Sequence, residues 1–321
     1  PEYRAEREKI NDLEHTKLKV SFDFSKQHLL GEAWITLRPH FYDVQEVELD
    51  AKAMLIHKVT KDGKDLKYEY DGNLLRIDLD KTYTREDSFT IYIDYTARPE
   101  EVTQQGSAAI TSAKGLYFVD PDGTNPNKPT QVWTQGETEA SSCWFPTIDS
   151  PNQKTSQEIY MTVPAKYVTL SNGLLKEQKN NSDGTRTDYW KFDKKHAPYL
   201  FFMGVGEYSI VKDKWRDIDV DYYVEKEYEP YARGIFGLTP EMLDFYSDYT
   251  GVDYVWSKYA QIVGRDYVSG AMENTTAVIH GEMAYQTGSE LVDQNTWEGT
   301  IAHELFHHWF GDLVTTESWS N

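Results

Sequence analysis

The chain has 321 residues, a formal net charge of -20 at neutral pH, 14% aromatic and 27% charged residues. This length suffices for two domains with separate cores, and the negative charge argues against nucleic acid or an anionic membrane as a partner. No apolar run approaches the length of a membrane span. The single cysteine, Cys143, excludes an internal disulfide framework. We expect a soluble protein. Because the sequence begins at Pro1, its targeting cannot be read, and a cytoplasmic and a periplasmic or secreted location both remain open.

Short segments of alternating apolar and polar residues fill the first two hundred positions, as in half-buried strands. Leu18 and Val20 alternate with lysines in the first of them, and Asp62-Gly63 provides a hairpin turn. No helical period separates the segments, which predicts an antiparallel sandwich or saddle. The predicted strands are 17–24, 30–37, 44–49, 54–59, 66–70, 74–79, 89–95, 158–163, 167–171, 188–192 and 199–208.

The periodicity changes near residue 210. Residues 215–224 still alternate, but Thr239 followed by Pro240 predicts a helix start with a capping threonine, and Gly251 predicts its end. A short strand at 259–263 follows. We therefore predict an α+β multidomain protein, with an N-terminal β domain at 1–210 and the beginning of an α+β domain at 211–321.

A metal-binding pattern, His-Glu-x-x-His, occupies His303, Glu304 and His307. Helical residues four apart lie on one face, so both histidines can point at one metal ion. Glu304 lies one step round the helix, where its carboxylate can reach a water on that metal. The flanks favour a helix over 297–310, with Thr296 as N-cap and Gly311 as the stop.

The bare pattern also occurs in unrelated proteins, where the alternative is an exposed helix with solvated histidines. Apolar residues between and beside the polar triplet argue against that alternative, because a solvated helix would not need them. His308 projects about 100° away from His307 around the helix, which favours a packing or supporting role over a ligand role.

Two further segments carry a carboxylate beside glycine. In Gly270-Ala271-Met272-Glu273-Asn274 the small residues would let backbone groups approach a ligand closely, and Glu273 adds an anion. Far upstream, Thr134-Gln135-Gly136-Glu137 offers a second such carboxylate. From the residues alone, an ordinary loop is the favoured interpretation of each segment.

Together these motifs resemble the aminopeptidase N family of zinc metallopeptidases, which includes the leukotriene-hydrolase branch. The resemblance implies an N-terminal β saddle followed by a thermolysin-like catalytic domain that uses Zn²⁺. It covers most of the chain, through residues 134–137, 145–151, 171–173, 270–274 and 303–315.

The resemblance also implies a role for each matching residue. His303 and His307 would bind zinc, and Glu304 would be the general base that activates the zinc-bound water. Glu273 would bind the free α-amino group of a peptide, and the remaining substrate contacts would come from Gly270, Ala271, Gln135 and Glu137. The leukotriene-hydrolase branch carries glutamine at the position of Glu137, so this chain looks like a plain aminopeptidase.

The chain departs from the family in two places. Relatives supply the third zinc ligand from a glutamate about nineteen residues past the second histidine, beyond Asn321, and zinc sites need three protein ligands. Glu317 has the wrong spacing for this role, so we expect an N-terminal portion of a longer enzyme that is inactive by itself. In addition, Thr275 and Thr276 replace the aromatic-glycine pair that is common in relatives.

Three functions remain in competition. A zinc aminopeptidase acting on peptides with a free N-terminus uses every motif. A thermolysin-like endopeptidase shares the zinc helix but has no use for Glu273 and Glu137, so an N-acetylated peptide separates the two. A non-catalytic scaffold would be expected to have lost Glu304 or a histidine, and all three residues are present.

Overall fold

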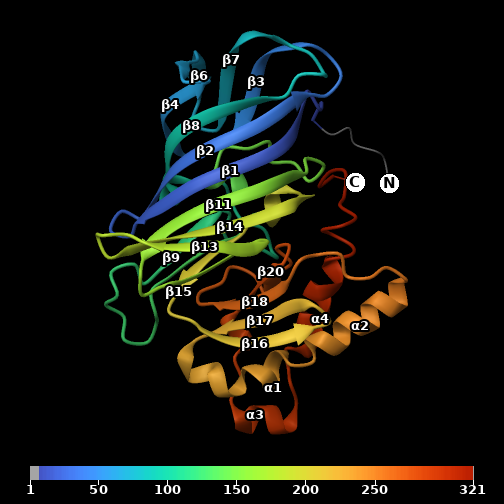
Figure 1. Ribbon diagram of the computed structural model, residues 1–321. Helices are drawn as coiled ribbons and strands as arrows, with labels where there is room; N and C mark the ends of the chain where they lie inside the picture. The colour runs from blue at the N-terminus through green and yellow to red at the C-terminus, as the bar shows by residue number, and fades with distance from the viewer. Residues whose placement is uncertain (1–6, 321) are drawn as a thin grey trace.

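The computed structural model describes residues 7–320, which form four sheets and a small set of helices (Figure 1). The largest sheet has eight strands in the order β13-β14-β11-β1-β2-β8-β4-β5. Its strands are β1 (Asn11–Asp23), β2 (His28–Pro39), β4 (Met54–Lys61), β5 (Lys64–Asp65), β8 (Phe89–Ala97), β11 (Thr155–Pro164), β13 (Leu174–Asn180) and β14 (Thr185–His196). The alternation expected from the sequence is present: Leu18 and Val20 on β1 are buried between half-buried or exposed neighbours.

Two smaller sheets complete the first part of the chain. One has the order β3-β7-β6 and the other β12-β15-β10-β9. Their strands are β3 (Val44–Asp50), β6 (Tyr68–Tyr70), β7 (Leu74–Tyr83), β9 (Leu116–Val119), β10 (Gln131–Thr134), β12 (Val168–Ser171) and β15 (Met203–Gly206). The four-stranded sheet matters for function, because β10 leads directly into Gln135 and Glu137.

The last part of the chain is a mixed five-stranded sheet in the order β16-β17-β18-β20-β19, with helices beside it (Figure 1). Its strands are β16 (Ser209–Trp215), β17 (Ile218–Val224), β18 (Tyr259–Gly264), β19 (Ala271–Met272) and β20 (Ala277–Gly281). The helices are α1 (Ala232–Phe236), α2 (Thr239–Thr250), α3 (Gly288–Asp293) and α4 (Glu298–His307). Short 3₁₀ turns lie at Pro99–Glu101, Ser141–Cys143, Pro198–Leu200, Lys226–Tyr231 and Glu282–Ala284. None of the helices within 7–320 has both the length and the apolarity that crossing a bilayer requires.

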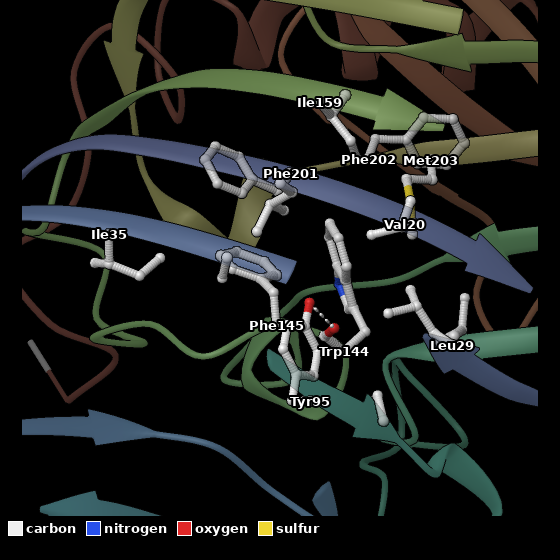
Figure 2. Packing of buried hydrophobic residues seen from close by; sticks show 14 of the residues in the cluster. Val20, Leu29, Ile35, Tyr95, Trp144, Phe145, Ile159, Phe201, Phe202 and Met203 are labelled. Atoms are coloured by element: carbon white, nitrogen blue, oxygen red, sulfur yellow. Dashed lines mark hydrogen bonds between the residues drawn. The ribbon is translucent and has the colours of Figure 1, made fainter. Parts of the chain in front are cut away.

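Two clusters of buried apolar side chains hold these layers together. The first lies between the β sheets, where Trp144, Phe145 and Phe201 pack against one another and the Tyr95 hydroxyl donates to the Trp144 carbonyl at 3.0 Å (Figure 2). Gly31 is required there, because a Cβ would lie 2.3 Å from the Tyr95 ring. The second cluster lies under the helices and includes the inner face of α4.

The α+β class is confirmed, and several local predictions are wrong. The large sheet is not purely antiparallel: β1 and β11 run parallel, since the long connection between them lets the chain return in the same direction. The strand predicted at 199–208 is a 3₁₀ turn followed by β15. Thr239 does not cap α2 but is its first residue, and its hydroxyl donates to the Phe236 carbonyl. Gly251 ends α2 as expected, with a left-handed φ of 69°.

Candidate active site

Helix α4 presents its two histidines on one side and buries the other. Ile301 and Leu305 are buried in the second apolar cluster, whereas His303 is exposed and His307 is half-buried. The helix spans Glu298–His307, shorter than predicted. The predicted cap is wrong: the N-cap is Trp297, and the Thr296 hydroxyl donates to the Gln286 side chain instead.

The geometry of the two imidazoles fits one zinc ion. The Nε2 atoms of His303 and His307 lie 3.0 Å apart, and two nitrogens bound to one tetrahedral zinc at about 2.0–2.1 Å lie about 3.3 Å apart. The Nδ1–H of His307 donates to the Phe310 carbonyl at 2.9 Å, which leaves Nε2 as the lone-pair nitrogen. Partial desolvation of its ring, followed by the neighbouring His307, lowers the pKa of His303 and favours the neutral form that binding to a metal needs.

No third ligand joins this pair within residues 7–320, where no group of three His, Cys, Asp or Glu side chains is placed to hold a metal. Glu317 therefore does not complete the set. The described residues therefore offer a histidine pair, and a catalytic zinc requires three protein ligands.

Glu304 is buried beside the metal pair, on the same helix. Only 5% of the residue is exposed. Burial, followed by the charges of Glu273 and Glu137, raises its pKa to about 9. An opposite charge entering the cluster would offset the burial and the two like charges and would favour the ionised carboxylate.

Glu273 lies in the turn of the hairpin that joins β19 to β20, at the edge of the five-stranded sheet. Ala271 and Met272 pair antiparallel with His280 and Ile279, so the chain reverses just beyond Met272 and holds Glu273 at the end of the strand. Glu273 contributes to the raised pKa of Glu304. The hairpin therefore brings this carboxylate next to the metal helix.

Gln135 and Glu137 follow β10, from the other part of the fold. Gly136 between them is needed because a Cβ would lie 2.2 Å from the Tyr199 carbonyl oxygen. Burial, then Glu273, raises the pKa of Glu137 to about 7, and His307 acts in the opposite direction. The amide nitrogen of Gln135 is buried without a hydrogen-bond partner in the structure. Glu137 therefore reaches the same acidic cluster, and the Gln135 side chain accepts from the Glu137 backbone N–H at 3.4 Å.

Gly270 and Ala271 border this cluster on the strand side. A Cβ at Gly270 would meet nothing within 4 Å, so no protein atom occupies that space. The Gly270 carbonyl accepts from the Gly281 backbone at 2.9 Å, which fixes the chain as it enters β19. The half-buried Gly270 therefore leaves its backbone accessible to a bound molecule.

Two tyrosines belong to the same region and were not predicted from the sequence. The Tyr199 hydroxyl donates to Glu273 at 3.4 Å. The Tyr267 hydroxyl is buried without a partner and interacts electrostatically with Glu304, Glu273 and Glu137. Tyr267 lies three residues before Gly270, so its proximity to that motif was the available signal, whereas nothing in the sequence around Tyr199 pointed to the cleft.

Comparisons with known proteins place these residues in a family context. The model of the peptidase M1 N-terminal domain matches residues 12–200, and the model of the peptidase family M1 domain matches residues 235–321. The second match contains the hairpin and the metal helix, and the first contains Gln135 and Glu137.

Curated relatives match along nearly the whole chain. Tricorn protease-interacting factor F2 from Thermoplasma acidophilum is 27% identical over 311 residues, covering 95% of this chain and 36% of the relative. Proteins named probable aminopeptidase 1 from Sulfurisphaera tokodaii and Saccharolobus solfataricus are each 26% identical, over 311 and 309 residues, with the same coverage. The chain thus spans little more than a third of the length of these relatives.

Proposed function

Because the chain belongs to peptidase family M1, a family of zinc metallopeptidases, we propose that this protein is a zinc aminopeptidase that releases N-terminal residues from peptides. The observation that carries the proposal is the cluster of three carboxylates beside the histidine pair. Glu137 comes from the β domain, Glu273 from the β19–β20 hairpin and Glu304 from α4, and their charges act on one another. We also propose the domain boundary at 210/211, which falls just inside β16.

An acidic cluster of this kind suits a substrate with a positive end. A peptide with a free N-terminus carries an ammonium group, and charge-assisted hydrogen bonds to two carboxylates are strong and directional. Glu137 and Glu273 would hold that ammonium, with the Gln135 amide beside them. Once the ammonium is fixed, the first peptide bond lies at a set distance from the metal helix. An internal peptide bond has no ammonium to offer, so an exopeptidase follows.

The remaining residues fit the hydrolysis step. His303 and His307 would hold zinc through their facing Nε2 atoms. When bound, zinc supplies a Lewis acid and lowers the pKa of a coordinated water. Glu304 would take the proton from that water and pass it to the leaving amine. Gly270 and Ala271 would bind the peptide backbone, since the space over Gly270 is open.

The experiment compares hydrolysis of alanyl-p-nitroanilide with hydrolysis of its N-acetylated form by the full-length protein. We expect turnover of the free amine only, loss of turnover after zinc chelation, and recovery when zinc is restored. Equal turnover of both substrates would contradict the aminopeptidase proposal and favour an endopeptidase. No turnover of either by zinc-loaded protein would contradict an enzymatic role altogether.

A further inference from the structure

Three residues after Glu273, one threonine, Thr276, joins three other parts of the fold. The Thr276 backbone N–H donates to Nε2 of His308 at 3.0 Å, and its carbonyl accepts from the Ala260 N–H at 3.0 Å. Its hydroxyl oxygen accepts from the Gly173 N–H at 2.8 Å and from the Lys258 ammonium at 3.2 Å. The β domain, strand β18 and the residue after α4 therefore all bind this one position.

Thr276 holds an unfavourable backbone conformation at this point. Its φ is 66°, in the left-handed region, which is rare for a β-branched residue. Such a conformation is energetically unfavourable and persists only where the surrounding structure determines it. Thr276 is fully buried and each of its polar atoms is hydrogen-bonded. The strain indicates a position fixed by its contacts rather than by its own preference.

His308 is held as firmly as its partner. Because Thr276 donates to Nε2, the proton of the neutral ring is on Nδ1, which donates to the Glu304 carbonyl at 3.2 Å. The ring lies between Tyr254 and Tyr259, with centroid distances of 5.7 and 5.0 Å, and the residue is 1% exposed. Neither the ring nor its tautomer can change without breaking a buried hydrogen bond.

The link between these two residues connects the segment that carries Glu273 to the segment that carries His307. Thr276 lies three residues after Glu273, and His308 directly follows His307. Among the described residues, the bond between them joins the 273–276 turn directly to the end of the metal helix. We propose that this bond is a positioning device for the proposed aminopeptidase function, setting the distance between the amine-binding carboxylate and the metal, and thereby selecting α-amino acids.

The selectivity follows from the geometry of the substrate. A β-amino acid carries one more methylene between its amine and its carbonyl carbon, so its ammonium and scissile bond lie farther apart by about one bond length. Misplacing the reacting groups by about 1 Å costs on the order of 100-fold in rate. A cleft with a fixed spacing therefore rejects β-alanyl substrates, and a loosened spacing discriminates less.

Two substitutions of similar size separate positioning from general structure. In His308→Gln the side-chain carbonyl can replace Nε2 as the acceptor for the Thr276 N–H. In His308→Asn the shorter amide can replace the Nδ1 donor to the Glu304 carbonyl but does not reach Thr276. Both replacements are neutral and polar, so burial affects them alike.

The experiment measures kcat/KM for α-alanyl- and β-alanyl-p-nitroanilide in the full-length, zinc-loaded wild type and both variants. We expect the ratio of kcat/KM for the α-substrate to that for the β-substrate to stay within about threefold of wild type in His308→Gln. In His308→Asn we expect this ratio to fall at least about tenfold, mostly through a lower kcat/KM for the α-substrate. Hydrogen exchange of residues 273–277, measured without substrate, should accelerate in His308→Asn alone.

Equal behaviour of the two variants, in either the preference or the exchange, overturns the proposal. So does a loss of activity in His308→Asn that is the same for both substrates, because that indicates a general structural defect. If the wild type hydrolyses neither substrate, the aminopeptidase function fails, whereas the exchange measurement still decides whether the bond orders the hairpin.

Discussion

Two groups of histidines show how the same side chain serves different purposes in this fold. His303 is exposed and His307 is half-buried, and the Nε2 atom of each ring lies 3.0 Å from that of the other. His196, His280 and His308 are fully or almost fully buried, and both ring nitrogens of each are hydrogen-bonded. Within the described residues, the buried histidines therefore have a complete set of hydrogen-bond partners, whereas His303 and His307 do not.

This difference shows that hydrogen-bond pairing, rather than residue type, distinguishes the histidines of a candidate binding site from those with a structural role. Burial lowers the pKa of His196, His280 and His308 to about 3, so these rings stay neutral and structural. Around the cleft, the Gln135 amide nitrogen and the Tyr267 hydroxyl are buried without partners. Buried polar groups normally have partners, so groups left without one are candidates for contact with a ligand.

We expect the largest effect from a substitution of Glu304, which lies beside the His303 and His307 pair. Glu304→Gln keeps the size of the side chain but removes the base, so kcat should fall at least about 1000-fold while zinc content stays unchanged. Elemental analysis and steady-state kinetics on the full-length protein check both. Glu298→Gln, on the exposed first turn of α4, is the matched control and should retain full activity. Retained turnover in Glu304→Gln would refute the proposed base.

The amine anchor should give the next largest effect. Glu273→Gln replaces a charge-assisted hydrogen bond to the ammonium by a neutral one, so KM for alanyl-p-nitroanilide should rise about 10- to 100-fold. The change should be smaller in kcat than in KM, because the metal helix is untouched. Glu282→Gln, a carboxylate that pairs with Arg265 instead, is the control. An unchanged KM would remove Glu273 from substrate binding.

Much of the fold was predictable because its strands alternate so regularly. The alternation on β1 and the turn at Asp62-Gly63 appear in the structure, where β4 and β5 pair across that turn. The parallel pairing of β1 with β11 could not be foreseen, since alternation says nothing about which distant strand is a neighbour. The caps at Thr239 and Thr296 failed because each hydroxyl found a nearer partner, the Phe236 carbonyl and the Gln286 side chain.

The candidate site likewise has residues that the sequence predicted and residues that it did not. Helical spacing alone brought His303 and His307 together, because that relation is local. The approach of Glu137 to Glu273 depends on how the β domain packs on the five-stranded sheet, and only the family resemblance suggested it. Tyr267 and the bond from Thr276 to His308 escaped prediction, since they depend on side chains meeting across elements.

The buried histidines predict a smaller, pH-dependent effect on stability. Burial lowers the pKa of His280 to about 3 in the folded protein from its ordinary value of 6.5, so between these values the unfolded chain binds a proton that the folded protein does not. The stability present above about pH 6.5 is therefore lost as the pH falls, by about 2 kcal/mol at pH 5. In His280→Gln this component is absent.

Urea unfolding of the full-length wild type and His280→Gln, at pH 7 and pH 5, measures this component as the change in their stability difference. We expect the advantage of the wild type to shrink by about 2 kcal/mol at pH 5. His57→Gln is the control, because that ring is solvent-accessible and bonds only to the Thr96 hydroxyl. A difference that does not vary with pH would mean that His280 is protonated in the folded protein.

We expect the smallest effect on stability from two buried tyrosine hydroxyls, one with a hydrogen-bond partner and one without. Tyr95→Phe removes the hydrogen bond to the Trp144 carbonyl and should cost about 1 kcal/mol of unfolding free energy (Figure 2). Tyr267→Phe removes a hydroxyl that has no partner, so the burial cost of that group disappears and stability should stay equal or rise by up to about 1 kcal/mol. Urea unfolding of the full-length protein without substrate checks both. A loss in Tyr267→Phe as large as that in Tyr95→Phe would show that its hydroxyl is paired in the free protein, which would place Tyr267 with the scaffold rather than with the cleft.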